Sequence, residues 1–364
     1  MKNNKIQWIL GAVALLVLPL VLQYFGNAWV RIADLALLYV MLALGLNIVV
    51  GYAGLLDLGY VAFYAVGAYM FGLLASPHLT ENFAWFAANF PDGLHMSLWM
   101  VIPVALVLAA CTGVLLGIPV LKLRGDYLAI VTLGFGEIIR IFMNNLDAPV
   151  NITNGPQGIN RVDTFKIGEW ALGRPETILG FRITGPEKYY YLLLALVILI
   201  IFVCIRLQNS RVGRAWEAVR EDEVAAKAMG INTRNIKLMA FGMGASFGGV
   251  AGCLFASMQG FVSPESFGLT ESIAILCMVV LGGMGHVPGV VAGAILLSIF
   301  PEVLRSIVVP LQETLFGEVV IDPDGIRMLL FGVAMVAIMI FRPEGLWPSQ
   351  VRKRELNRGK EQPA

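Results

Sequence analysis

Apolar runs long enough to cross a bilayer recur from one end of this 364-residue chain to the other. A membrane-spanning helix needs about 20 mostly apolar residues. Because hydrocarbon offers no hydrogen-bond partners, such segments must satisfy their backbone groups within helices. The sequence therefore predicts an all-α polytopic integral membrane protein with about ten transmembrane helices. The candidate spans lie near 8–25, 33–52, 58–76, 97–121, 126–145, 189–207, 236–258, 268–285, 287–304 and 326–341.

Composition agrees with this interpretation and excludes several other classes. Hydrophobic residues make up 58% of the chain and charged residues 14%, whereas soluble domains carry about 25% charged residues. A net charge of +1 gives no basic field for nucleic acid. The cysteines lie singly in apolar runs and the histidines are far apart, so we predict neither a disulfide nor a metal site.

The spans form one transmembrane domain, 1–345, followed by a polar tail, 346–364. The first apolar run has no small-residue cleavage site after it, so we interpret it as a retained helix and not a signal peptide. The pair at 268–304 is compatible with two crossings or with a re-entrant hairpin. Lys and Arg gather in alternate loops, which predicts that both termini are cytoplasmic. The polar loop at 208–236 is then cytoplasmic, and the long loop at 146–188 is periplasmic.

The loop at 208–236 holds the densest charge, in the stretch WEAVREDEVAAKAMGINTRNIK. Asn209 and Ser210 are candidate caps for a helix that begins near Arg211. Gly230 is expected to end that helix in a left-handed conformation, with Thr233 capping the next one. Its charges are mixed in sign and its apolar residues are mainly alanine, unlike a lipid-bound surface helix. The alternatives are a docking helix for a cytoplasmic partner and an ordinary solvated loop.

Several segments resemble a known family. The run AAKAMG at 225–230 is similar to the E-A-A-x-x-x-G loop of ABC importer permeases, with Val224 in place of the leading glutamate. The chain as a whole resembles the M-type permease of branched-chain amino-acid importers. The segments that carry this resemblance are LALGLNIVVGYAGLLDLGYVAFYAVGAY (42–69), LRGDYLAIVTLGFGEIIR (123–140), GRAWEAVREDEVAAKAMGI (213–231), QGFVSPESFG (259–268) and VVLGGMGHVPG (279–289).

The resemblance implies an ABC importer permease fold in the bacterial inner membrane, importing leucine, isoleucine and valine. It implies a second, dissimilar permease subunit, two cytoplasmic ATPase subunits and a periplasmic amino-acid-binding protein as partners, in contact with membrane lipid. The chain would be no enzyme and would hold no cofactor, because ATP and Mg²⁺ would bind the ATPase subunits. No G-x-x-x-x-G-K-[ST] motif occurs in the sequence.

The resemblance and the residue types together suggest four groups of functional residues. The expected ATPase-coupling residues are Arg214, Glu217, Arg220, Glu221, Asp222, Glu223, Ala225, Ala226 and Gly230. Asn47, Gly51, Asp57, Glu137 and Arg140 are candidates for a pathway or gate, although Asp57 is equally compatible with a solvated position and Glu137–Arg140 with a simple ion pair. Gly244, Gly248 and Gly252 form a small-residue stripe for helix packing. Pro264 and Glu265 are expected contacts for the binding protein.

Two other functions compete with this interpretation. An importer permease for urea or short amides would share most of these motifs. An intramembrane serine protease is the alternative from another class, because GASFG at 244–248 matches G-x-S-x-G. That motif needs a strand–turn–helix setting and a nearby histidine. Ser246 instead lies within an apolar span, and the histidines lie in loops or at span ends.

Overall fold

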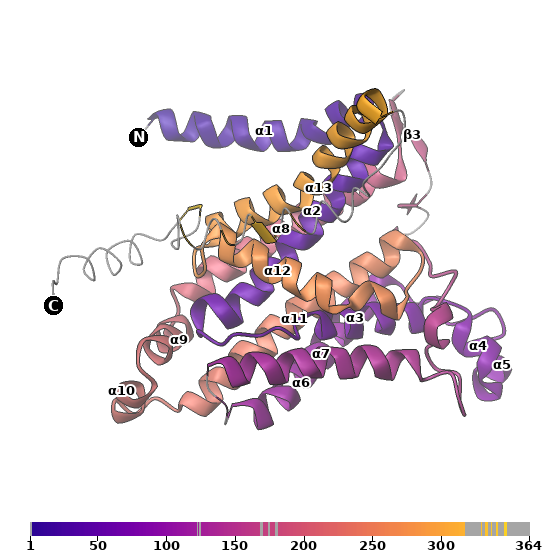
Figure 1. The fold of residues 1–364 in the computed structure, drawn as a ribbon. Coiled ribbons are helices and arrows are strands. Elements are labelled where there is room, and N and C mark those ends of the chain that lie inside the picture. The colour runs from indigo at the N-terminus through magenta and orange to yellow at the C-terminus, as the bar shows by residue number, and fades with distance from the viewer. Residues whose placement is uncertain are drawn as a thin grey trace.

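A computed structural model describes residues 2–121, 123, 125–167, 170–173, 175–178 and 181–316, together with 329, 332, 333, 336, 340, 346 and 347. Apart from these single positions, the expected span at 326–341 and the polar tail lie outside the described residues. Figure 1 shows a bundle of long helices whose axes run between two ends of the molecule.

Each expected span before residue 316 is a helix in the structure. These helices are α1 (Lys2–Phe25), α2 (Asn27–Asn47), α3 (Val61–Leu74), α6 (Leu98–Val120), α7 (Asp126–Asn144), α8 (Gly185–Gln208), α11 (Thr233–Gln259), α12 (Leu269–Gly282) and α13 (Val287–Phe316). Among the described residues, six helical segments are long and apolar enough to cross a membrane. The helices α1 and α3 contribute shorter apolar segments, Val13–Phe25 and Val61–Leu74. The predicted all-helical membrane fold is confirmed.

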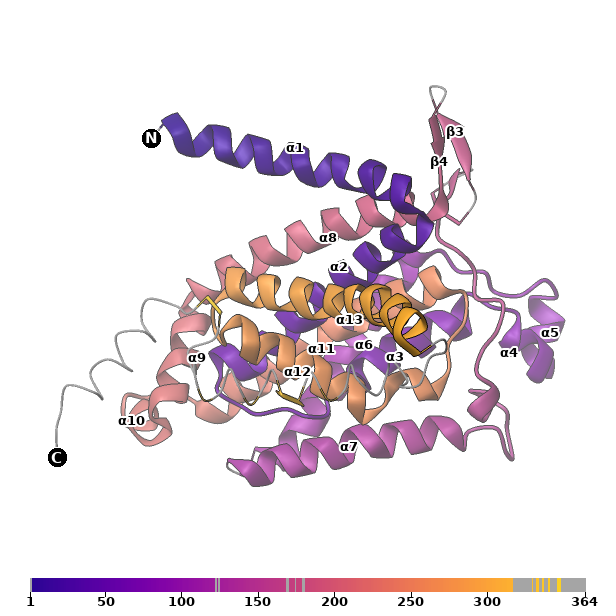
Figure 2. The same cartoon turned by 45° about the horizontal axis from the view of Figure 1, so that its top comes forward.

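Shorter elements gather at the two ends of the bundle. One end carries α4 (His78–Asn82), α5 (Ala84–Asn89) and two small antiparallel hairpins, β1–β2 (Lys166–Ile167 with Trp170–Ala171) and β3–β4 (Glu176–Ile178 with Phe181–Ile183). The opposite end carries α9 (Arg211–Glu221) and α10 (Glu223–Ala228), as both views of the ribbon show (Figures 1 and 2). The 3-10 turns η2 (Gly155–Gln157) and η3 (Pro264–Phe267) connect longer elements.

The core of the bundle lies around α2 and α11. Met41, Leu42 and Leu44 on α2 are fully buried, as is Phe241 on α11. The outer helices keep large apolar side chains exposed, among them Leu115 and Phe202. Water would penalise so large an apolar surface, whereas lipid or a second membrane subunit would not.

The glycine stripe of α11 packs against its neighbours without side chains between them. A Cβ atom on Gly244 would lie 2.6 Å from Val49 Cγ2, and one on Gly252 would lie 2.6 Å from the Ala68 amide nitrogen. Gly248 faces the side chain of Phe63 at 3.2 Å. The stripe therefore brings α11 against α2 and α3 at distances that a larger residue would not allow.

The pair α12–α13 forms two antiparallel passes along the bundle. The turn η3, which precedes α12, lies beside α7, where Glu265 pairs with Arg140. The turn after α12 lies at the opposite end, where Gln208 Nε2 donates to the Gly285 carbonyl at 3.3 Å. Because α12 runs from one end of the bundle to the other, the structure favours two crossings over a re-entrant hairpin.

Helix α1 is held to α8 through a site that a proline creates. Pro19 has no backbone N–H, so the carbonyl of Leu15 lacks its usual partner one turn later. The Tyr190 hydroxyl donates to this carbonyl at 3.0 Å, and the Tyr191 hydroxyl donates to the next one, on Leu16, at 3.0 Å. The two tyrosines therefore fix the position of the first helix on the bundle.

Candidate functional site: the polar loop and the broken helix

The polar loop consists of two short helices and not the single expected one. Ser210 caps α9, because its Oγ accepts from the Gly213 amide at 3.1 Å. The chain then leaves helical geometry at Asp222, whose Oδ1 accepts from the amides of Val224 at 2.7 Å and Ala225 at 3.0 Å. An aspartate that caps a helix in this way starts a new helix instead of continuing the old one. The expectation of one helix over 211–230 was wrong for this reason.

The end of α10 follows the sequence prediction. Gly230 has φ +83°, and its amide donates to the Lys227 carbonyl at 3.0 Å. The Ile231 amide donates to the Ala226 carbonyl at 3.1 Å. This pair of bonds is a Schellman motif, which satisfies the last carbonyls of a helix.

The cap of α11 differs from the expected one. Asn232, and not Thr233, holds the cap position, and its Oδ1 accepts from the Asn235 amide at 3.2 Å. The Thr233 hydroxyl instead donates to Glu223 Oε1 at 3.2 Å. Thr233 is drawn away from its own helix by this carboxylate.

Glu223 fastens α10 to the start of α11. Its Oε2 accepts from Lys237 Nζ at 2.7 Å, and its Oε1 lies 3.1 Å from Lys227 Nζ. The Lys237 side chain is only 9% exposed, so this ion pair is largely shielded from water. The hydrogen bond from Lys237, assisted by Lys227, lowers the pKa of Glu223 from 4.5 to about 2. Glu223 is therefore charged and bound within its own chain at neutral pH.

The outward face of α10 carries an apolar patch, which we call the tip patch: Val224, Ala225, Ala228 and Met229. Val224 is 69% exposed and Met229 is 83% exposed. Ala226 faces the body of the protein and is only 4% exposed. The expectation that Ala226 contacts a partner is therefore corrected. The expected coupling residues Arg214, Glu217 and Glu221 on α9 and Asp222 at the start of α10 are also exposed.

The inward face of α9 is an apolar and aromatic surface. Trp216 is fully buried, and its indole nitrogen donates to the Ile236 carbonyl at 2.7 Å. Its ring stacks on Tyr52, with 6.4 Å between centroids and 16° between planes. Val219, one turn later, is also buried. The polar loop is thus bound to the bundle on one face and exposed on the other.

The central helix α2 ends in a broken segment beneath α9. Its last turn is a π-helix, η1 (Ile48–Tyr52). The Asn47 Oδ1 accepts from the Gly285 amide at 2.8 Å, and a Cβ atom on Gly51 would lie 2.6 Å from that amide nitrogen. Only glycine fits at position 51, because the backbone of the α12–α13 turn lies directly against it. The structure therefore brings the predicted residues Asn47 and Gly51 together.

Asp57 lies elsewhere in the same connection. It is 1% exposed, which overturns the solvated alternative, and its Oδ1 accepts from the Gly59 amide at 2.9 Å. The next amide, of Leu58, donates to Thr132 Oγ1 at 3.0 Å. Asp57 thus shapes a tight turn that packs against α7.

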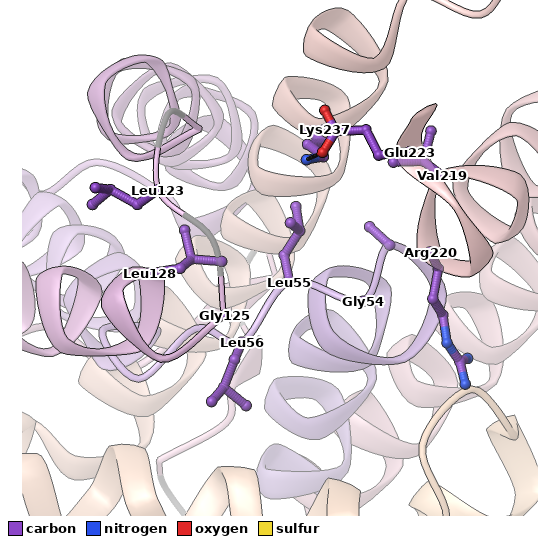
Figure 3. Close-up of a pocket in the computed structure, with 11 residues that line it drawn as sticks. Gly54, Leu55, Leu56, Leu123, Gly125, Leu128, Val219, Arg220, Glu223 and Lys237 are labelled. Atoms are coloured by element: carbon purple, nitrogen blue, oxygen red, sulfur yellow. Dashed lines mark hydrogen bonds and ion pairs between the residues drawn. The ribbon is translucent and has the colours of Figure 1, made fainter. Parts of the chain in front are cut away.

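A pocket of about 210 Å³ opens between the polar loop and the bundle (Figure 3). Leucines from the two connections before α3 and α7 form its apolar wall, and Arg220, Glu223 and Lys237 form its polar wall. The residues that line it are Ala53, Gly54, Leu55, Leu56, Leu123, Gly125, Leu128, Val219, Arg220, Glu223 and Lys237.

At the opposite end, two predicted groups of residues meet. Arg140 Nε donates to Glu137 Oε1 at 3.0 Å, which confirms the ion pair within α7. Arg140 also reaches Glu265 on η3, at 3.4 Å. The Glu265 side chain is 70% exposed, whereas Pro264 is buried. Pro264 therefore offers no surface to a partner, and this expectation is corrected.

The sequence patterns considered above assign no role to Trp216, Val224 or Met229. The spacing of Val212, Trp216 and Val219 carries the inward-facing helical period and would have revealed the bound face of α9. No simple sequence pattern predicts that Val224 and Met229 are exposed. The direction in which their side chains point depends on the interruption between α9 and α10 at Asp222.

Ser246, the residue behind the protease alternative, donates its hydroxyl to the Met243 carbonyl of its own helix at 2.7 Å. This is the ordinary behaviour of a serine inside a helix. No strand–turn–helix context surrounds it, since positions 233–259 form one continuous helix.

Apolar helices that run between two polar ends, with a polar helical loop bound to the broken end of the central helix, define a polytopic membrane protein of the permease class. A family described as "Branched-chain amino acid transport system / permease component" matches residues 28–339. The chain belongs to this family, and it is a transport subunit and not an enzyme.

Individual relatives agree with the family match. The chain is 42% identical over 362 residues to the high-affinity branched-chain amino acid transport system permease protein LivM of Escherichia coli (strain K12), covering 95% of this chain and 76% of that one. It is 28% identical over 335 residues to a probable LivM of Methanocaldococcus jannaschii, covering 86% of this chain and 91% of that one. It is 26% identical over 287 residues to LivH of E. coli K12, covering 78% and 86%. No solved structure matches the chain.

Proposed function

We propose that this permease moves leucine, isoleucine and valine across the inner membrane as one half of a heterodimer with a second, dissimilar permease subunit. Two cytoplasmic ATPase subunits drive the cycle, and a periplasmic binding protein delivers the amino acid. ATP and Mg²⁺ bind the ATPase subunits, and this chain holds no cofactor. The match to both LivM and LivH supports a pair of related but unequal membrane subunits.

The tip patch is the observation that carries the proposal. An apolar patch surrounded by charges on a soluble loop is typical of a protein-binding surface. The loop that carries it is fixed to the bundle by Trp216 on α9 and by the ion pair of Glu223 with Lys237. A patch on a rigid support can transmit movement of a docked ATPase to the membrane helices, whereas an ordinary solvated loop would not be anchored in this way.

Two observations support a cytoplasmic position for this loop. The N-terminal end of α1 lies at the same end of the bundle as α9 and α10 (Figure 2). The Leu346 amide, near the end of the chain, donates to the Leu281 carbonyl at 2.8 Å, beside the α12–α13 turn at that same end. With the Lys and Arg bias of the loops, this favours both termini in the cytoplasm. Glu265, at the opposite end, is then available to the binding protein.

Binding of the ATPase subunits tests the docking surface. Val224→Asp places a charge at the centre of the tip patch, and burying an unpaired charge in an interface weakens binding strongly. We expect the amount of ATPase that copurifies with the solubilised transporter to fall about tenfold or more, and leucine uptake to fall with it. The matched control is Val150→Asp, at an exposed valine in the loop at the opposite end of the bundle, which should leave both unchanged.

Undiminished ATPase binding in Val224→Asp, with Val150→Asp behaving in the same way, would contradict the docking proposal. Because soluble ATPase subunits reach only the cytoplasmic face, the same experiment tests the orientation of the loop.

A further inference from the structure

Four segments of the chain meet around the side chain of Arg220 on α9. Its guanidinium NH1 donates to the Gly51 carbonyl at 2.7 Å. Gly285, in the α12–α13 turn, lies beside both groups: a Cβ atom there would be 3.2 Å from the Gly51 oxygen and 3.3 Å from Arg220 NH1. Gln208, at the end of α8, donates to the Gly285 carbonyl. One arginine thus joins the polar loop to the end of the central helix.

The chemistry of this contact is that of a helix C-terminus. The last carbonyls of a helix have no partner within it, and their aligned dipoles place partial negative charge there. Gly51 lies in the π turn that ends α2, and the guanidinium satisfies its carbonyl. A hydrogen bond from a charged donor is stronger than one between neutral groups.

The methylene groups of the Arg220 side chain are also packed closely, against Gly54. Gly54 has φ +68°, and a Cβ atom there would lie 2.7 Å from Arg220 Cγ and 3.3 Å from Arg220 Cβ. One turn earlier on α9, Trp216 stacks on Tyr52, the last residue of η1. These two contacts, four residues apart on one helical face, bind α9 to the last residue of η1 and to the segment just after it.

We propose that Arg220 is the positioning residue that passes movement of the polar loop to the broken end of α2. This inference rests on the proposed function, in which the ATPase docks on the tip patch. When the ATPase subunits move α9, the Arg220–Gly51 hydrogen bond makes η1 move with it. The hydrogen bond between Asn47 and Gly285 then makes the α12–α13 turn move as well. The bond stays closed through the transport cycle and acts as a rigid link.

Removing the guanidinium should uncouple the transporter without dismantling it. Arg220→Met keeps the apolar stem against Gly54 and loses the hydrogen bond to Gly51. In proteoliposomes holding the assembled transporter, we expect bound ATPase and ATP hydrolysis to persist. Labelled leucine taken up per ATP should fall about tenfold, the factor for loss of one charge-assisted hydrogen bond. The control is Arg211→Met, at an exposed arginine that begins the same helix, which should leave leucine uptake per ATP unchanged.

A reversible disulfide tests the mechanical claim directly. The Cβ separation at positions 54 and 220 is 3.3 Å, close to the roughly 3.5–4.5 Å of a disulfide. We would introduce Gly54→Cys with Arg220→Cys and replace the exposed Cys111 by serine. The reduced protein should be as uncoupled as Arg220→Met, and oxidation should restore leucine uptake per ATP. The reduced form also controls for strain at position 54.

Persistently low uptake per ATP in protein whose disulfide is verified by mass spectrometry would overturn the proposal, as would unchanged coupling in Arg220→Met. These outcomes are distinct from failure of the docking surface. If the docking proposal is wrong, the transporter with Val224→Asp will still copurify with its ATPase subunits. If only the link is wrong, Val224→Asp releases the ATPase while Arg220→Met transports leucine normally.

Discussion

The position of Glu223 explains how this chain departs from the importer loop that it resembles. Val224 stands where that loop has its leading glutamate, and Glu223 precedes it. In the structure the carboxylate turns inward to Lys237, and Val224 points outward. The glutamate therefore anchors the loop, and an apolar residue takes the exposed place.

The anchoring by Glu223 should depend on pH. Because pairing with Lys237 lowers the pKa of Glu223 from 4.5 to about 2, its contribution to stability is fully present above about pH 4.5 and is lost as the pH falls toward 2. We expect Glu223→Gln to speed hydrogen exchange of the amides of 223–232 at pH 7 by about tenfold or more, as loss of a charged hydrogen bond would.

The ratio of amide hydrogen-exchange rates between the Glu223→Gln variant and the parent protein should be smaller at pH 3 than at pH 7. Glu217→Gln, at an exposed carboxylate of α9, serves as the control and should change little. A ratio for Glu223→Gln that is independent of pH, or close to one at pH 7, would contradict the anchoring role.

Single residues in the loop were predictable where the signal is local. Gly230 was expected to end a helix because glycine adopts the left-handed conformation freely, and it does so. Asp222 and Asn232 were missed as caps. Asp222 lies inside a continuous run of helix-forming residues, and Thr233 is a capping residue type whose hydroxyl is engaged by Glu223, ten positions earlier.

At the scale of elements, the spans followed from apolar length alone, because hydrocarbon leaves a chain few alternatives to helix. The π turn at the end of α2 did not follow. Its shape depends on Gly285 and Arg220, which are distant in sequence from Gly51. The small hairpins at 166–183 were also unpredicted, because their strands are two or three residues long and carry no clear alternation.

The glycine stripe of α11 gives a matched pair of substitutions. Gly252→Ala would place a methyl group 2.6 Å from the Ala68 amide nitrogen, so α11 and α3 must move apart. Overpacking of this kind costs about 1–3 kcal/mol, and we expect a lower thermal unfolding temperature in detergent. Gly134→Ala, on α7, meets nothing within 4 Å and should be neutral or slightly stabilising. Equal unfolding temperatures for the two variants would show that the stripe does not hold these helices together.

At the scale of the whole molecule, the class and family of the protein could be predicted from the sequence. The contacts between the polar loop and the membrane helices could not. Composition and span length establish a polytopic membrane protein, and the motifs establish the permease family. That one polar loop is fixed to the broken central helix depends on contacts such as Trp216–Tyr52 and Arg220–Gly51. Those contacts join α9 to residues more than 150 positions away, which no local pattern encodes.

Uptake of labelled leucine, with labelled urea as the comparison, shows whether this chain takes part in importing a branched-chain amino acid. Cells that lack this chain would be compared with the same cells after the chain is restored, with and without depletion of ATP. We predict that restoration returns leucine uptake, that ATP depletion abolishes it, and that urea uptake does not change. Restored urea uptake without leucine would keep the permease but assign it another cargo. Leucine uptake that is the same with and without this chain would show that the chain is not part of a leucine importer.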